Sequence, residues 1–145
     1  MNILVPFVRG ELGRTAVRAA VDELAVRGGS LRLLGHVRVT DSDAGANVRA
    51  VRTALEQQAS ALRDRGIACE DVWSVGPQTL AARTLDAARS WPADLIVMGY
   101  RQRSRVGKLV LGSYEQSILL HADCPVLAVL ADARDLGGSS GAVEG

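Results

Sequence analysis

Residues 94–130, DLIVMGYRQRSRVGKLVLGSYEQSILLHADCPVLAVL, contain two short apolar runs separated by a basic loop and an amphipathic stretch. The first run, Leu95–Met98, ends at Gly99, and the second, Pro125–Leu130, follows the amphipathic stretch Tyr114–His121. Short apolar runs bounded by glycine or proline are typical of buried strands, and apolar residues at helical spacing are typical of a helix. The segment therefore predicts a strand, a loop, a helix and a final strand, the unit from which parallel sheets are built.

The start of the expected helix has the features of an anion-binding site. Gly112 and Ser113 precede it, and Ser113 with Gln116 three residues later matches a capping box. Unpaired backbone N–H groups and the helix dipole attract anions at such a start. No acidic residue lies between Leu95 and Tyr114, whereas the loop carries four basic residues: Arg101, Arg103, Arg105 and Lys108. We expect any ligand held there to be anionic; the alternative is a solvated loop in which Ser113 only caps the helix.

Strand-like and helix-like segments alternate along the rest of the chain. The other expected strands are Asn2–Phe7, Leu31–Val39 and Cys69–Val75, and the other expected helices span the apolar positions from Leu12 to Leu24, from Val48 to Leu62 and from Thr79 to Arg89. Strict alternation predicts an α/β fold with a doubly wound five-stranded parallel sheet and helices on both faces. A strand order of 3-2-1-4-5 places strands one and four side by side, so that the loops 8–11 and 100–111 border one cleft.

The composition is that of one compact domain. A chain of 145 residues with 48% hydrophobic residues has room for a single core, and with only 3% aromatic residues that core must consist mainly of aliphatic side chains. We expect the domain to cover residues 1–131. Residues 132–145 are rich in glycine and serine and lack apolar periodicity, so we expect a flexible tail there.

Charge and hydropathy exclude two classes of partner. The net charge is only +1, whereas domains that bind nucleic acid in general carry a clear basic excess. No run of about 18 apolar residues and no charged leader before a long apolar segment is present, which argues against a membrane partner. We expect a cytoplasmic protein that binds neither nucleic acid nor membrane.

No pattern of catalytic or metal-binding residues is recognisable in the sequence. Cys69 and Cys124 lie beside apolar runs and lack metal-ligand spacing, so we expect reduced core residues. His36 and His121 are far apart and have no cysteine or carboxylate partners at metal-ligand spacing. No Ser/His/Asp set or pair of carboxylates suggests a general base. The sequence therefore predicts a binding protein with no metal and no enzymatic activity.

At the loop and its flanks the chain resembles the universal stress protein family, over about residues 2–130. The signature of ATP-binding members is Gly, two residues, Gly, nine residues, then Gly with Ser or Thr. Gly99, Gly112 and Ser113 match it, and Gln102 stands where the second glycine belongs. The segments ILVPFVRG, residues 3–10, and HADCPVLAV, residues 121–129, also resemble the family's first turn and last strand.

The resemblance implies a flavodoxin-like fold of the kind found in adenine nucleotide alpha hydrolases, and a binding or regulatory role in the stress response. It also implies a homodimer through the last strand, because an apolar edge strand exposes backbone groups that a partner can pair. The residues that it places around a nucleotide are Pro6, Phe7, Val8, Val37, Met98, Gly99, Arg101, Gln102, Gly112, Ser113, Tyr114 and Glu115.

At three of these positions the chain departs from the ATP-binding pattern. Val8 stands where an Asp usually contacts the nucleoside, Gln102 replaces a glycine, and Glu115 replaces a small hydroxyl residue that faces the phosphates. A valine accepts no hydrogen bond, and a carboxylate repels a triphosphate. We therefore expect a degenerate site that binds ATP weakly or not at all. The alternative is a reworked pocket that binds ATP, with or without Mg²⁺, and acts as a nucleotide-dependent switch.

Overall fold

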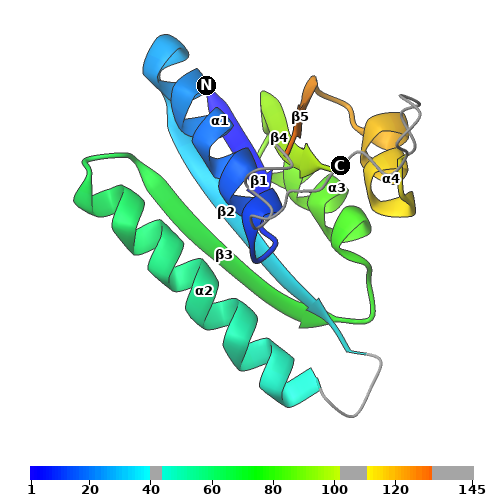
Figure 1. The fold of residues 1–145 in the computed structure, drawn as a ribbon. Coiled ribbons are helices and arrows are strands. Elements are labelled where there is room, and N and C mark those ends of the chain that lie inside the picture. The colour runs from blue at the N-terminus through cyan, green and yellow to red at the C-terminus, as the bar shows by residue number, and fades with distance from the viewer. Residues whose placement is uncertain (40–43, 102–110, 132–145) are drawn as a thin grey trace, which may run out of the picture.

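The computed structural model describes residues 1–39, 44–101 and 111–131, and in them strands and helices alternate (Figure 1). The elements are β1 (Asn2–Pro6), α1 (Glu11–Arg27), β2 (Ser30–Arg38), α2 (Ala44–Asp64), β3 (Cys69–Gly76), α3 (Leu80–Ser90), β4 (Leu95–Tyr100), α4 (Ser113–His121) and β5 (Val126–Leu130). The strands form one parallel sheet in the order β3-β2-β1-β4-β5. The predicted fold class and strand order are confirmed.

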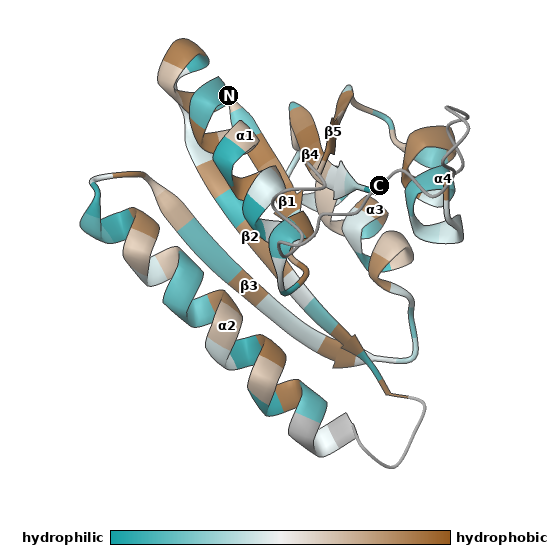
Figure 2. Ribbon diagram, in the orientation of Figure 1, coloured by the Kyte–Doolittle hydropathy of each residue, from teal (hydrophilic) through white to brown (hydrophobic). Residues whose placement is uncertain are grey.

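Helices α1 and α2 cover one face of the sheet, and α3 and α4 cover the other (Figure 1). Alternate residues of β1 point to opposite faces, so Ile3 and Val5 join the core under α1 and α2 while Leu4 joins the core under α3 and α4. The central strands β1 and β4 are largely apolar because both of their faces are covered (Figure 2). None of the described helices is long and apolar enough to cross a membrane.

Two element boundaries differ from the prediction in ways that bear on the site. Gly99 does not end β4, because Gly99 and Tyr100 still pair with Val129 and Leu130 of β5. The predicted capping box is also wrong, because the helix cap is Gly112, with φ −75° and ψ 174°, and no side chain caps the helix. Ser113 is therefore the first residue inside α4. The predicted tail, residues 132–145, lies outside the described residues.

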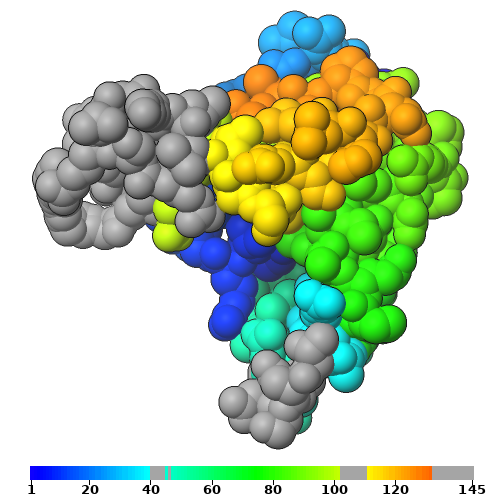
Figure 3. All heavy atoms as spheres, turned by 90° about the vertical axis from the view of Figure 1, so that its right-hand side faces the viewer, coloured from blue at the N-terminus to red at the C-terminus, as the bar shows by residue number. Residues whose placement is uncertain are grey.

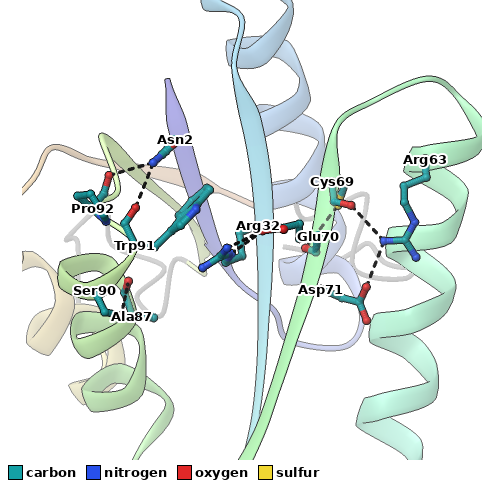
Figure 4. Close-up of polar contacts among 10 residues, drawn as sticks. All are labelled: Asn2, Arg32, Arg63, Cys69, Glu70, Asp71, Ala87, Ser90, Trp91 and Pro92. Carbon is teal, nitrogen blue, oxygen red and sulfur yellow. Dashed lines mark hydrogen bonds and ion pairs between the residues drawn. The ribbon is translucent and has the colours of Figure 1, made fainter.

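Polar contacts tie α3 to the amino-terminal edge of the sheet (Figure 4). The guanidinium of Arg32 on β2 lies 4.4 Å from the centroid of the Trp91 ring at the end of α3. The same group pairs with Glu70 on β3, with Nη2 and Oε1 2.5 Å apart. On β1, the Asn2 side chain donates to the carbonyl oxygens of Trp91 and Pro92. These contacts fix the end of α3 against three neighbouring strands.

Candidate functional site

Strands β1 and β4 are neighbours at the centre of the sheet. After β1 the chain continues to β2 on one side, and after β4 it continues to β5 on the other. Ile3 pairs with Leu95 and Leu4 pairs with Ile96, so the carboxyl ends of both strands lie at the same edge of the sheet. The residues after β1 and the start of α4 both lie at this edge. Doubly wound folds bind their ligands at such a switch point, and the sequence-based prediction placed the ligand cleft here.

The turn after β1 presents apolar side chains. Pro6 and Phe7 are buried, and the Phe7 N–H donates to the carbonyl oxygen of Leu34 at 2.8 Å. Val8 is partly exposed, and its backbone is fixed by the close approach of Gly13 in α1, where a Cβ would lie 1.8 Å from the Val8 carbonyl oxygen. The side chains of Pro6, Phe7 and Val8 offer no hydrogen-bonding group to a ligand.

Met98 and Val37 lie on opposite faces of the sheet. Met98 has no exposed surface and packs in the core under α3 and α4. Val37 lies inside β2, four residues after Leu33, so both side chains point to the same face of the sheet, and Leu33 packs under α1 and α2. It is 4% exposed. Neither side chain presents a surface on which an adenine ring could rest in this structure.

Gly99 has a packing role that needs no ligand. A Cβ at Gly99 would lie 2.6 Å from the backbone carbonyl oxygen of Leu12 in α1. Real Cβ atoms do not approach so closely, so a side chain at position 99 would push α1 away from β4. Gly99, which matches the first glycine of the signature, is thus required for the close packing of α1 against β4.

The start of α4 keeps the backbone geometry of an anion site. Gly112 is extended, its carbonyl oxygen accepts from the Gln116 N–H at 3.0 Å, and the Gln116 side chain donates to the Leu111 carbonyl oxygen at 2.9 Å. The first N–H groups of a helix have no intrahelical acceptor. Ser113 is exposed in this turn. Because Ser113 is exposed and is not used as a cap, its hydroxyl can reach a ligand at this helix start.

Glu115 is the chemically unusual residue of this turn. It is 4% exposed, and its Oε1 has no hydrogen-bond partner. No ion pair involves Glu115 among the residues that the structure describes. The neighbouring Tyr114 has a pKa well above its ordinary value, mainly because the ring is buried and secondarily because of the charge on Glu115. A buried carboxylate without a donor is costly, and its partners are normally found within the protein or in a ligand.

Two cavities divide the predicted site residues between them. Phe7 and Val8 line a cavity of about 430 Å³ that opens between α1 and α2. Ser113 and Tyr114 line another, of about 410 Å³, between the starts of α3 and α4. In Figure 3, the N-terminal part of the chain (dark blue) comes to the surface beside α4 (yellow). The structure therefore brings both groups of residues to one edge but places them in separate cavities.

Arg9 and Gly10, which also line the first cavity, belong to the loop 8–11 that was expected to border a cleft, whereas five other lining residues were not predicted from the sequence: Arg14, Ala54, Gln57, Gln58 and Ala61. Arg9 and Arg14 lie close to the turn in the sequence, and their positive charges could have indicated that they belong to the site. The α2 residues face this cavity only because β2 lies beside β1, so no local pattern reveals them. The predicted loop residue Gln102 and the basic residues Arg103, Arg105 and Lys108 lie outside the described residues. Arg101, the last residue before that gap, is exposed.

His36 belongs to a hydrogen-bond network beyond the predicted site. Its Nε2 lies 2.7 Å from the Gln78 carbonyl oxygen, which can only accept, so Nε2 carries the proton. Its Nδ1 therefore accepts from the Ser74 hydroxyl at 2.8 Å, and Ser74 Oγ in turn accepts from Arg83 Nε at 3.2 Å. The ring therefore links β2 to β3 and to the loop before α3. Across the described part of the chain, no group of three His, Cys, Asp or Glu residues is placed to hold a metal ion.

A model of the universal stress protein family matches residues 1–129 of the chain. The chain belongs to the universal stress protein family. A universal stress protein of Mycolicibacterium smegmatis is 35% identical to it over 128 residues, which cover 88% of this chain and 95% of that protein. The family that the sequence resemblance suggested is therefore confirmed.

Solved structures of universal stress proteins share this fold. One from Archaeoglobus fulgidus has a TM-score of 0.76 at 23% identity, covering 88% of this chain and 96% of that chain. Another from Archaeoglobus fulgidus, solved in complex with dAMP, has a TM-score of 0.65 at 18% identity, covering 88% of this chain and 95% of that chain. At these identities the likeness is one of fold.

Proposed function

We propose that this universal stress protein is a cytoplasmic regulatory binding module whose nucleotide site has degenerated, so that it binds ATP weakly or not at all. The observation that carries the proposal is Glu115 in the first turn of α4, whose side chain is buried and whose Oε1 has no hydrogen-bond partner. The free N–H groups of that turn are the natural place for phosphates. A carboxylate in the same helical turn opposes a triphosphate there, because the two negative charges repel each other.

The turn after β1 supports the same proposal from the other side of the cleft. Val8 gives the nucleoside no hydrogen-bond acceptor, and Met98 is enclosed in the core. The amino-acid side chains that fix orientation in ligand pockets are a few well-placed polar groups. At this edge the Pro6–Val8 turn has no polar side chain. Glu115 is polar, but its negative charge repels a phosphate instead of binding it.

The second candidate function is that of an ATP-binding switch with a reworked pocket. The observation that favours it is the uncapped start of α4, with Arg101 exposed after β4 and a relative that was solved with dAMP. In that case Arg101 would lie along the phosphates and Mg²⁺ could accompany them. Binding would then fall with rising salt, because exposed charges are screened.

The proposed role does not include catalysis. Hydrolysis of a nucleotide needs a group that activates water, and the nearest carboxylates to the cleft are Glu11 and Glu115. Glu11 is engaged by Arg14 and by Arg18 on α1. Glu115 is buried. A binding role needs none of this chemistry and accounts for the same residues.

We include in the proposal a homodimer formed through β5. The Ala131 N–H donates to Tyr100 and the Pro125 carbonyl accepts from Ile96, so the odd-numbered residues of this segment direct their backbone groups toward β4. The even-numbered residues 126, 128 and 130 then direct theirs toward the free edge. Leu130 is 46% exposed there. A second copy would pair these groups and cover the apolar strand.

Release of bound nucleotide tests the proposed function. The purified protein is denatured and the supernatant is separated by chromatography for adenine nucleotides. We expect none in stoichiometric amount, because the cleft lacks the contacts that would retain ATP through purification. About one ATP per chain would contradict the proposal and favour the switch.

A further inference from the structure

We propose that the groove between α1 and α2 is a docking site for an acidic amphipathic helix of a partner protein. The α1–α2 groove consists of the cavity of about 430 Å³ that Phe7 and Val8 line and a further cavity of about 410 Å³ that continues along α1. Arg14 and Gln58 line both cavities, so the two form one groove. The inference goes beyond the proposed function, because it does not depend on whether the start of α4 binds ATP.

The packing of the helices on the sheet leaves this groove open. On one face α3 and α4 pack against each other, whereas on the other face α1 packs mainly on β4 and β1, and α2 packs on β2 and β3 (Figure 1). Along α1 the groove runs from Gly10 to Asp22, which at 1.5 Å per residue is about 18 Å. This length fits about three turns of a helix and is far more than a single anion needs.

The charged residues along the groove are mainly basic. Among the described residues, its lining contains Asp22 as the single acid and four arginines: Arg9, Arg14, Arg18 and Arg65. Glu11, beside the groove, pairs with Arg14, and its Oε2 lies 3.9 Å from Arg18 Nη2. The arginines therefore outnumber the two nearby carboxylates, and the groove keeps an excess of positive charge that attracts an acidic partner.

The two walls of the groove share this charge. Arg14 and Arg18 lie one helical turn apart on α1, whereas Arg65 follows α2 on the other wall. The acceptors that α2 itself offers to the groove are the neutral amides of Gln57 and Gln58. Guanidinium groups bind carboxylates in strong charge-assisted hydrogen bonds. Glutamate or aspartate side chains on a docked helix would meet such groups on both sides.

Apolar residues between the basic walls favour an amphipathic helix over a simple polyanion. Val8, Val21 and Ala54 line the groove and are partly exposed, and Ala61 is exposed. A polyanion such as a nucleic acid would leave these side chains uncovered. An amphipathic helix would bury its own apolar side chains against them while its acidic side chains meet the arginines, as in other helix-in-groove complexes.

The probe is a labelled helical peptide of about 15 residues made of Glu, Ala and Leu, with a leucine every three or four residues and glutamates beside them. Fluorescence anisotropy should show micromolar binding at about 50 mM salt that weakens several fold at about 200 mM salt, because exposed charges are screened. The same peptide with lysine for glutamate should not bind, and alanine for leucine should weaken binding about five-fold or more.

Three results would overturn the inference. They are no binding of the glutamate peptide up to about 1 mM, which corresponds to only about 4 kcal/mol, equal binding of the lysine peptide, and tighter binding of a single-stranded DNA of similar length. The last result would mean that the groove is a general polyanion surface.

Substitutions of exposed arginines test where the peptide binds. Arg14→Gln and Arg65→Gln remove charge from opposite walls and should each weaken peptide binding about three-fold, and the double variant about ten-fold. The matched control is Arg52→Gln, which removes the same charge from an arginine that also pairs with a glutamate, Glu56, but lines neither cavity. It should leave the affinity nearly unchanged. If Arg52→Gln weakens binding as much as Arg14→Gln does, the peptide responds to net charge alone and the inference fails.

Discussion

Arg32 is a single residue on which three elements depend. Its guanidinium stacks on Trp91 and pairs with Glu70, and its side chain is 25% exposed (Figure 4). Cation–π contacts at partly exposed sites contribute about 0.5 to 1 kcal/mol, and the aliphatic part of an arginine adds packing. The exposed ion pair itself contributes little. The stacking on Trp91 is thus the main contribution of Arg32 to stability.

We predict that Arg32→Ala lowers the free energy of unfolding by about 1 to 2 kcal/mol, measured by urea denaturation. The matched control is Arg52→Ala, which removes an exposed pair with Glu56 within α2 and should cost less than about 0.5 kcal/mol. A double-mutant cycle with Trp91→Leu isolates the stacking. Equal losses for Arg32→Ala and Arg52→Ala would show that Trp91 contributes nothing.

Cys69 couples stability to alkaline pH. Burial raises the pKa of its thiol from 9.0 to about 11. The charge of Arg63 lowers this pKa by a smaller amount, and the charges of Asp71 and Glu70 raise it further. Between these values the native state keeps the proton and the unfolded state loses it. Stability is therefore fully present below pH 9 and falls as the pH rises toward 11, by on the order of 2 kcal/mol.

Urea denaturation between pH 8 and pH 11 measures this effect. Cys69→Ala lacks the thiol, so the difference between wild type and variant should shrink by on the order of 2 kcal/mol across the range. Cys124→Ala is the control for the other cysteine, which is only partly buried. A wild-type curve parallel to that of Cys69→Ala would mean that the thiol ionises equally in both states.

At the scale of elements, α1 is seated by two glycines. Gly13 lies against the Val8 carbonyl, and Gly99 of β4 lies against the Leu12 carbonyl. We predict that Gly99→Ala destabilises the fold by about 1 to 3 kcal/mol, because its Cβ would meet backbone atoms that cannot give way. Gly45→Ala is the control, since a Cβ there meets nothing within 4 Å and alanine favours a helix. Thermal denaturation of both variants checks the difference.

The elements were largely predictable because each has a local signal. Leu12, Ala16, Val17, Ala20 and Leu24 repeat at helical spacing, and α1 follows them to Gly28. The boundaries near the site were less predictable, since Gly99 reads as a strand end when only the sequence is known. Pairing with Val129 extends β4 through it. The cap of α4 is Gly112 and not the predicted Ser113. Which of the two residues caps the helix depends on the backbone conformation, which the capping-box pattern alone does not reveal.

At the scale of the whole molecule, the candidate site combines segments that are distant in the sequence, and their arrangement was predictable only in part. The strand order, which places β1 beside β4, was predictable, and it brings the carboxyl ends of both strands to the same edge of the sheet. The separation of Phe7 and Val8 from Ser113 and Tyr114 into two cavities did not, because it depends on how the helices pack. The burial of Glu115 was equally hidden, since a glutamate in a first helical turn is usually exposed.

The free edge of β5 gives a prediction about assembly. The backbone N–H of Ala128 is directed away from β4, so Ala128→Pro removes a donor from the edge without breaking the β4 ladder. We predict that the wild type sediments as a dimer at micromolar concentration and that Ala128→Pro shifts it toward the monomer. Circular dichroism should show an unchanged fold. A wild-type mass of one chain would contradict the β5 dimer.

Calorimetric titration of the nucleotide-free protein with ATP and Mg²⁺ tests the central claim most directly. The buried Glu115, whose Oε1 has no partner, and the apolar turn at Val8 predict no measurable binding up to about 1 mM ATP, which corresponds to less than about 4 kcal/mol of binding free energy. A dissociation constant in the micromolar range would contradict the account and would mean that the cleft remains an ATP site despite both residues.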